Sequence, residues 1–401
     1  MKIERLDHNG RGIGYLNGKI TFVSNALPSE EVDITNIVEK KKFIEADTKY
    51  INNVSNKRRK VECPYYDLCG GCNIMHMNYE TQIEFKKNKL NDILKKFGDI
   101  DLNVNFVLCD SEFNYRDKIT LKVENNKLGY HMCKTNKVIE IDKCLLANKI
   151  INEKIKIIKD IKDFKSCYEI SIRNVNSDKT AITFYLHNDN ETLNFKDDNS
   201  IINYITENNS FICEDKSKII GKINKYKYYI SPQSFFQINI KQTVKILEDI
   251  KKYLTGKGKT LLDLYCGTGS IGIYMSDIYK NVLGIEICKP AIEDAKKNVT
   301  LNGLTNMNFF CGDTEKLIKN VKTNFDTLIV DPPRSGLTKH VIEDIFRILP
   351  KNLIYISCDP ITLARDLKIL KNNYNILNIT GYDMFPNTYH VESVCILEKM
   401  N

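Results

Sequence analysis

The sequence predicts an α/β protein in which a doubly wound parallel sheet follows a small β-barrel and an α+β central domain. From about residue 240, short apolar runs alternate with helical patterns, which is typical of a parallel sheet with crossover helices. Residues 1–52 instead hold short strand-like runs separated by Gly, Asn and Pro. A chain of 401 residues is also too long for one compact core. We therefore expect three domains, at residues 1–55, 56–235 and 236–401.

The composition, with 42% hydrophobic and 27% charged residues, is that of a folded globular protein. The net charge is +8, and Lys57-Arg58-Arg59-Lys60 forms a basic cluster that is either a solvated face or a contact for a polyanion. No apolar run resembles a signal peptide or is long enough to span a bilayer, so we expect a cytoplasmic protein. Some of the thirteen cysteines are then expected to be metal ligands or nucleophiles rather than disulfides.

The first 52 residues predict strands at 13–16, 20–23 and 32–38, joined by turns at Gly10-Arg11-Gly12, Asn17-Gly18 and Pro28-Ser29. Short strands linked in this way usually close into a small barrel. Such barrels often bind nucleic acid through a basic face and exposed aromatic side chains. A barrel that only packs on its neighbour is the alternative.

A polar, basic linker at 53–62 leads into three closely spaced cysteines, Cys63, Cys69 and Cys72. Cys144, which follows a strand-like run, is the best candidate for a fourth thiol. Four thiolates suit either zinc or an iron–sulfur cluster. Structural zinc usually takes its ligands as two close pairs, so three close thiols and one remote thiol favour an iron–sulfur cluster.

The middle of the chain predicts one amphipathic helix over 77–95, with apolar residues on one face and many lysines opposite. Strands are expected at 118–123, 168–173, 181–186 and 225–230. Near the end of this region, Phe235 and Phe236 either stack on a base or, more commonly for such a pair before a helix, are buried.

The stretch 260–272 predicts a buried strand, a glycine turn and a helix that opens near Ser270. Gly267 and Gly269 let the backbone approach a ligand closely. The spacing Gly267-x-Gly269-x-x-Gly272 also fits the dinucleotide fingerprint, so the turn alone leaves nicotinamide and other adenosine cofactors open. Glu286 ends the next strand, where a carboxylate accepts hydrogen bonds from ribose hydroxyls.

Chemistry-bearing residues follow the later strands of this sheet, which we place at 259–265, 281–286, 307–312, 326–331 and 353–357. The fourth strand ends at Asp331-Pro-Pro-Arg334, and the fifth ends at Ser357-Cys358-Asp359-Pro360. Cys358 is either an inert core thiol or, as its place at a strand end favours, a nucleophile. Glu392 enters a last strand at 394–398 and is a candidate general base.

At these motifs the chain resembles the S-adenosylmethionine-dependent RNA uracil-5 methyltransferases, over essentially its whole length. The motifs are Leu262-Asp-Leu-Tyr-Cys-Gly-Thr-Gly-Ser-Ile-Gly, Asp331-Pro-Pro-Arg-Ser-Gly, Ser357-Cys-Asp-Pro and His390-Val-Glu392. The resemblance implies a Rossmann-like methyltransferase sheet and an N-terminal TRAM domain. It also implies that the four thiols bind a [4Fe-4S] cluster and that Cys358 is the nucleophile. The implied S-adenosylmethionine contacts are Gln237, Tyr265, Glu286 and Asp331. Asn387 stands where many relatives carry His.

Methylation of uracil at C5 requires both a thiol and a carboxylate, because uracil C5 is too weak a nucleophile to take a methyl group unaided. Addition of a thiolate at C6 makes C5 electron-rich, and a base must later remove the C5 proton. We expect Cys358 and Glu392 to share these duties on a uridine that is flipped out of its stack. The expected substrate is 23S ribosomal RNA, because this chain has both a barrel and a cluster motif, which bacterial tRNA relatives generally lack. The alternative substrate is tRNA. The sequence indicates no membrane partner and no obligate protein partner.

Overall fold

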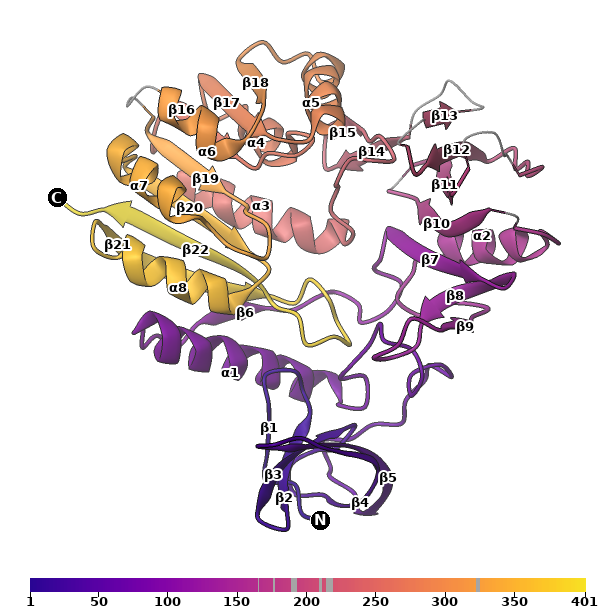
Figure 1. The fold of residues 1–401 in the computed structure, drawn as a ribbon. Helices are drawn as coiled ribbons and strands as arrows, with labels where there is room; N and C mark the ends of the chain where they lie inside the picture. The colour runs from indigo at the N-terminus through magenta and orange to yellow at the C-terminus, as the bar shows by residue number, and fades with distance from the viewer. Residues whose placement is uncertain (165, 176, 189–192, 209–210, 214–218, 322–324) are drawn as a thin grey trace.

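The computed structural model describes residues 1–164, 166–175, 177–188, 193–208, 211–213, 219–321 and 325–401 (Figure 1). The N-terminal part is a five-stranded sheet of order β1-β2-β3-β5-β4, which curls around a core of Ile3, Val23, Ala26 and Val32. Its strands are β1 (Arg5–Leu6), β2 (Gly12–Leu16), β3 (Lys19–Ser24), β4 (Glu31–Glu39) and β5 (Ile44–Asn53). The three strands expected here are present, and β5 is an additional strand that the polar sequence after Ile44 did not reveal.

The helix expected at 77–95 is α1 (Tyr79–Gly98), and it begins where the Asn78 side chain accepts a hydrogen bond from the backbone N–H of Thr81. It lies between the barrel and the C-terminal sheet (Figure 1). The short strand β6 (Asn105–Val107) then pairs in parallel with β21 (Tyr374–Tyr382) at the edge of that sheet. The domain boundaries at 55 and 235 stay a prediction, and the structure adds that α1 and β6 pack with the C-terminal sheet.

The central region is a seven-stranded sheet of order β13-β12-β11-β10-β7-β8-β9, with α2 (Lys149–Lys159) beside it (Figure 1). All four strands expected in the middle of the chain are present: three belong to this sheet and face its core, and the fourth, at 225–230, forms a separate hairpin that packs against the core of the C-terminal domain. The strands of this sheet are β7 (Lys118–Glu124), β8 (Lys127–His131), β9 (Val138–Glu140), β10 (Cys167–Arg173), β11 (Thr180–Leu186), β12 (Ser200–Thr206) and β13 (Phe211–Cys213). A hairpin of β14 (Ile220–Ile223) and β15 (Tyr226–Tyr229) and then α3 (Ile240–Leu254) follow.

The C-terminal sheet has eight strands in the order β18-β17-β16-β19-β20-β22-β21-β6. Its five parallel strands agree with those expected from the sequence, and their bounds are β16 (Thr260–Leu264), β17 (Asn281–Glu286), β18 (Met307–Cys311), β19 (Thr327–Val330) and β20 (Asn352–Ser357). The chain runs from β16 to one side and then returns to β19 on the other side, which places a topological switch point between these two strands. Ligands of such sheets bind at this point, at the carboxyl ends of the strands.

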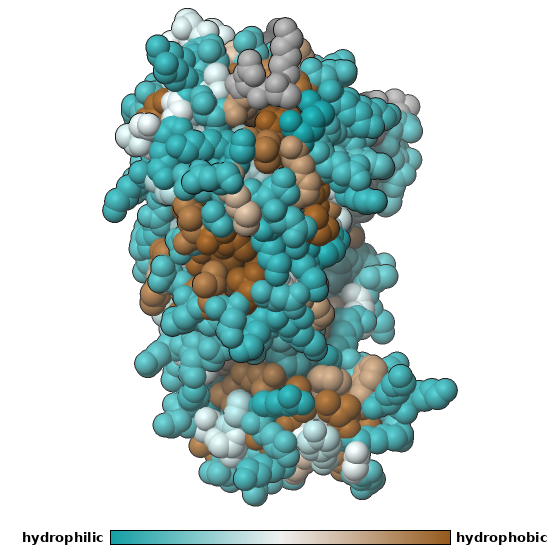
Figure 2. All heavy atoms as spheres, turned by 90° about the vertical axis from the view of Figure 1, so that its left-hand side faces the viewer, coloured by the Kyte–Doolittle hydropathy of each residue, from teal (hydrophilic) through white to brown (hydrophobic). Residues whose placement is uncertain are grey.

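Helices cover the sheet, and the antiparallel strand β22 (Glu392–Lys399) inserts between β20 and β21. The covering helices are α4 (Ser270–Met275), α5 (Lys289–Leu301), α6 (Thr314–Leu317), α7 (Lys339–Ile348) and α8 (Pro360–Leu370), with a short 3₁₀ turn at Ile318–Asn320. Figure 2 shows the barrel set off from the rest of the molecule by a groove. Within the described ranges, no helix is both long enough and apolar enough to cross a membrane.

Candidate active site and a neighbouring thiol cavity

The carboxyl edge of the C-terminal sheet brings the expected site residues together. Tyr265, Glu286, Asp331 and Cys358 each stand at or just after the end of a parallel strand. Strand β22 runs in the opposite direction, so Glu392 at its start lies at the same edge. In that ladder Ser357 pairs with Ser393, which makes Cys358 and Glu392 neighbours across two adjacent strands.

A small cavity of about 20 Å³ connects the glycine turn with this edge. Its wall includes Gln237, Ser270, Asp331, Met384 and Glu392. Gln237 comes from the segment before α3, whereas the other four belong to the C-terminal sheet and its loops. Residues more than 150 positions apart in the chain, Gln237 and Glu392, therefore border one space.

The turn after β16 has the backbone of a ligand-binding loop. Tyr265 and Gly267 both have positive φ, at 62° and 54°. A Cβ at Gly267 would meet no atom within 4 Å, whereas one at Gly269 would lie 2.7 Å from the Phe309 ring. Gly267 thus borders open space and Gly269 is required by packing. The Glu286 carboxylate spans the turn, because it accepts the N–H groups of Gly267 (3.1 Å) and Cys288 (2.8 Å).

Burial sets the protonation of the site. Glu392 is 8% exposed, and burial, followed by the charge of Asp331, raises its pKa well above the usual range. Burial also raises the pKa of Asp331 to about 7. The pKa of the Cys358 thiol is raised to about 11, first by burial and then by Glu392 and Asp331, while Arg334 opposes the shift. Near neutral pH the site therefore holds a protonated thiol beside carboxyl groups that readily take up a proton.

The two phenylalanines before α3 have different environments. Phe236 is 3% exposed and packs against Tyr228, with the ring centroids 5.5 Å apart. Phe235 is 65% exposed. The interpretation of the pair as buried is therefore correct for Phe236 and wrong for Phe235, because consecutive residues of an extended segment point in opposite directions.

The four cysteines expected to form one site line a second cavity, of about 50 Å³. Three come from the loop that precedes α1, and the fourth follows β9: they are Cys63, Cys69, Cys72 and Cys144. Burial raises the pKa of Cys63, Cys69 and Cys72, and the thiol of Cys144 raises each further. Among the cysteines that the structure describes, none is in a disulfide. Within the described ranges, no group of three or more Cys, His, Asp or Glu side chains is arranged to hold a metal ion.

Arg116 also lines this thiol cavity, and its positive charge lowers the pKa of both Cys69 and Cys72. Its buried Nε has no hydrogen-bond partner. A buried guanidinium N–H that has no partner and lies next to four thiols could donate a hydrogen bond to a negatively charged group that carries sulfur acceptors. The donor set and this orphaned N–H are therefore compatible with an iron–sulfur cluster.

Most of the basic cluster is used inside the molecule. Arg58 forms an ion pair with the fully buried Glu30 (2.7 Å), and Arg59 pairs with Glu112 (2.7 Å). Lys57 reaches Glu84 on α1 (2.7 Å). The two arginines are therefore held by carboxylates that are distant in sequence, and a contact of the cluster with a polyanion stays a prediction.

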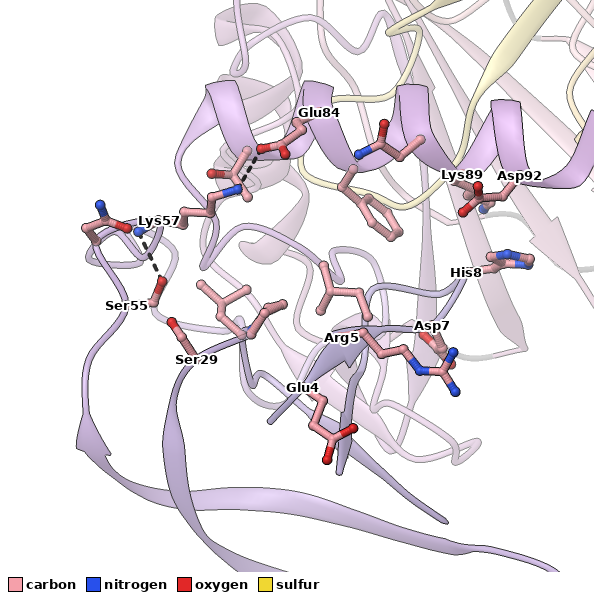
Figure 3. A pocket seen from close by; sticks show the side chains of 17 residues that line it. Glu4, Arg5, Asp7, His8, Ser29, Ser55, Lys57, Glu84, Lys89 and Asp92 are labelled. Carbon is pink, nitrogen blue, oxygen red and sulfur yellow. Dashed lines mark hydrogen bonds and ion pairs between the residues drawn. The ribbon is translucent and has the colours of Figure 1, made fainter. Parts of the chain in front are cut away.

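A cleft of about 410 Å³ separates the barrel from α1 (Figure 3). Arg5, His8, Lys57 and Lys89 face it together with acidic residues.

Sequence reasoning missed the contacts between α1 and the loop that precedes β22. The lysines of this helix were expected to face solvent, but Lys86 is fully buried and its Nζ lies 2.5 Å from Asp383 Oδ1. Lys89 Nζ donates to the carbonyl of Tyr389 (2.9 Å). A buried lysine is tolerated here because the Asp383 carboxylate and the backbone carbonyl of Phe385 accept hydrogen bonds from it. The only sequence signal was the helical spacing of the two lysines.

Comparisons with known proteins agree with this geometry. The tRNA (Uracil-5-)-methyltransferase family model matches residues 78–400, and the TRAM domain model matches residues 1–43. Two similar proteins are each named "Uncharacterized RNA methyltransferase". One, from Clostridium tetani, is 33% identical over 97% of this chain and 93% of its own length; the other, from Aquifex aeolicus, is 34% identical over 99% and 98%. The structure is also similar to the Pyrococcus abyssi tRNA (uracil-54, C5)-methyltransferase in complex with S-adenosyl-L-homocysteine, with a TM-score of 0.82 and 29% identity over 99% of both chains.

Proposed function

The chain belongs to the tRNA (uracil-5-)-methyltransferase family, and we propose that it methylates C5 of a uridine in 23S ribosomal RNA through a covalent intermediate on Cys358. It is an S-adenosylmethionine-dependent RNA methyltransferase with an N-terminal TRAM domain. The observation that carries the mechanism is the register of β20 and β22, which sets a thiol and a buried carboxyl group side by side at the cofactor edge.

The proposed steps use only these two groups. The thiol of Cys358 first loses its proton to solvent. The thiolate then forms a bond to C6 of the uracil, and the electron pair of the C5–C6 double bond moves into an enolate. C5 then takes the methyl group from the sulfonium of the cofactor. Glu392 removes the C5 proton, the C6–S bond breaks, and the thiolate leaves with its electron pair. A carboxylate whose pKa is raised by burial is a stronger base than an exposed one, which suits this duty.

The cofactor would lie across the turn after β16. Glu286 ends β17 in the position for ribose hydroxyls, and Tyr265 and Gly267 leave open space beside it. Gln237 and Asp331 border the cavity that connects this turn with Glu392. We assign all four side chains, Gln237, Tyr265, Glu286 and Asp331, to S-adenosylmethionine binding.

The [4Fe-4S] assignment of Cys63, Cys69, Cys72 and Cys144 is supported by their shared cavity and by the free N–H of Arg116. When bound, such a cluster would link the loop before α1 covalently to the segment after β9. It takes no part in the proposed methyl transfer, because the reaction moves no net electrons.

The second candidate is the same reaction on tRNA. It is favoured by the Pyrococcus abyssi enzyme, which is named for a tRNA and covers 99% of this chain. Because that match includes the barrel, the presence of a barrel does not separate the two substrates. Mapping of 5-methyluridine in ribosomal RNA and tRNA from a deletion strain decides between them. Loss from 23S ribosomal RNA alone supports the proposal, and loss from tRNA alone replaces the substrate with tRNA.

A further inference from the structure

The loop of residues 383–391, which leads from β21 to Glu392, is buried and held from several sides. Asn387 at its centre is fully buried and has a left-handed backbone, with φ of 67°. Asn adopts that conformation more readily than other residues with a side chain. Its hydrogen bonds lead directly to the thiol cavity.

The carbonyl of Asn387 accepts two backbone N–H groups, from Asn73 (3.0 Å) and Ile74 (3.2 Å). These two residues follow Cys72 immediately in the chain. In the other direction, Glu392 lies only five residues after Asn387. A short, buried chain of bonds therefore runs from a predicted cluster ligand to the predicted base.

The side chain of Asn387 fixes this junction further. Its Oδ1 accepts from Arg59 Nη2 (2.6 Å) and Gln82 Nε2 (3.1 Å), and its Nδ2 donates to the carbonyl of Glu112 (2.9 Å). The backbone N–H of Asn387 donates to Gln82 Oε1 (2.8 Å). Asn387 thus joins the linker, α1 and the segment after β6 at one point.

A second contact links the two sites independently. The hydroxyl of Tyr115 donates to the carbonyl of Pro386 (3.0 Å), one residue before Asn387. Tyr115 is buried and is the direct neighbour of Arg116, which lines the thiol cavity. The chain neighbours of two different lining residues of the thiol cavity, Cys72 and Arg116, are therefore bonded to adjacent residues of the same loop.

We propose that Asn387 is a positioning residue that couples the four-thiol site to Glu392, so that a filled thiol site holds the loop that leads to the base in its productive place. The inference rests on the proposed function for the role of Glu392, but the coupling itself is a property of the loop. An empty thiol site frees the Cys72 loop, and its two bonds to Asn387 weaken. Removal of the C5 proton then slows, while addition of Cys358 to C6 continues.

Hydrogen exchange of the full-length protein without RNA tests the coupling directly. Protein reconstituted with iron and sulfide is compared with the same protein stripped by a chelator, and the amides of residues 383–391 are followed against those of β16. We expect exchange of the loop to become about tenfold faster on stripping, the effect of losing one or two hydrogen bonds. Unchanged loop exchange would overturn the proposal, and so would faster exchange in β16 as well, since that is general unfolding.

Asn387→Gly keeps the left-handed backbone and removes the three side-chain bonds. It also keeps the backbone carbonyl that accepts from Asn73 and Ile74. We expect its loop to exchange faster than that of the wild type when iron is bound, while its iron content equals that of the wild type. Asn125→Gly is the matched control, because Asn125 also has a positive φ (51°) but lies in an exposed turn between β7 and β8. A loop in iron-loaded Asn387→Gly that exchanged as slowly as that of the iron-loaded wild type would contradict the positioning role of the side chain.

A denaturing gel with labelled RNA adds the link to catalysis. Stripped wild type and iron-loaded Asn387→Gly are both expected to accumulate the covalent RNA adduct, because a displaced base slows its release by about a hundredfold. Equal slowing of every step, with no adduct, would overturn the positioning role. If wild type gave neither methylation nor adduct, the proposed function would fail while the exchange result still decided the coupling.

Discussion

The two candidate sites each hold partly buried thiols, and the neighbours of these thiols differ. Burial raises the pKa of Cys358 and of three of the four thiols in the thiol cavity. Cys358 lies beside the carboxyl groups of Glu392 and Asp331, with Arg334 as the opposing charge. The described lining of the thiol cavity contains Arg116, Lys143 and tyrosines but no carboxylate. Burial is therefore common to both sites, and the charges around the thiols distinguish one site from the other.

This difference separates a transient bond from permanent ligation. A nucleophile that must be released needs a neighbour that moves a proton, which is the role proposed for Glu392. A set of ligands must instead stay deprotonated around a negatively charged group, which cationic neighbours favour and carboxylates oppose.

The largest effect is expected at Cys358. Cys358→Ala should lower methylation by about 10⁴-fold or more, because removing a nucleophile costs on that scale, while binding of S-adenosylmethionine is retained. Cys311→Ser is the matched control, since Cys311 is an exposed thiol at the end of β18, on the same edge of the sheet. Measured turnover of Cys358→Ala near the wild-type rate would remove the nucleophile assignment.

The thiol cavity should respond in iron content. Cys72→Ser is expected to lose most of the roughly four iron atoms that a cubane cluster contributes per chain, together with the brown colour. Cys133→Ser should keep them, because Cys133 is exposed and does not line the cavity. Elemental analysis of anaerobically purified protein makes the comparison, and zinc in place of iron in the wild type would refute the cluster.

Much of this contrast could be predicted from the sequence, because strands, turns and cysteine spacing are local signals. The five parallel strands, the position of Cys358 after one of them and the grouping of four thiols that share a cavity were predicted in this way, whereas the roles of these thiols stay predictions. The missed features are long-range: β6 joins β21 across more than 260 residues, and Lys86 meets Asp383 across 297. The same holds for Arg58, whose partner Glu30 lies in the barrel. A single sequence shows that these residues are charged but not which carboxylate each one reaches.

The pH dependence of the first step should show the charges around Cys358. Its pKa of about 11 means that the thiolate fraction, and with it the rate of adduct formation, rises with pH between 6 and 9. Arg334 lowers that pKa, so Arg334→Gln should raise it and move the profile to higher pH. The initial rate of adduct formation at several pH values measures this. A profile that moved to lower pH would contradict the assigned charge effect.

A smaller effect is expected at Asp263, a buried acid near Asp331 and Glu286. Burial raises its pKa to about 8, although the N–H of Gly272 donates to its Oδ2 (3.0 Å). A folded pKa above the unfolded value contributes stability at low pH that is lost as pH rises from about 4 to 8. Asn does not titrate, so Asp263→Asn does not lose this stability as pH rises. The difference between the melting temperatures of the variant and the wild type should therefore shift in favour of the variant from pH 5 to pH 8. A constant difference across that range would mean that the acid is not protonated in the folded state.

The central claim is that Cys358 and Glu392 act at different steps, and one gel tests it most directly. Wild type, Cys358→Ala and Glu392→Gln are incubated with labelled RNA and S-adenosylmethionine and then denatured. We predict no adduct for Cys358→Ala. For Glu392→Gln we predict a stable, methylated RNA–protein adduct, because the C5 proton stays and the thiolate cannot leave. An adduct with Cys358→Ala, or normal turnover by Glu392→Gln, would contradict it.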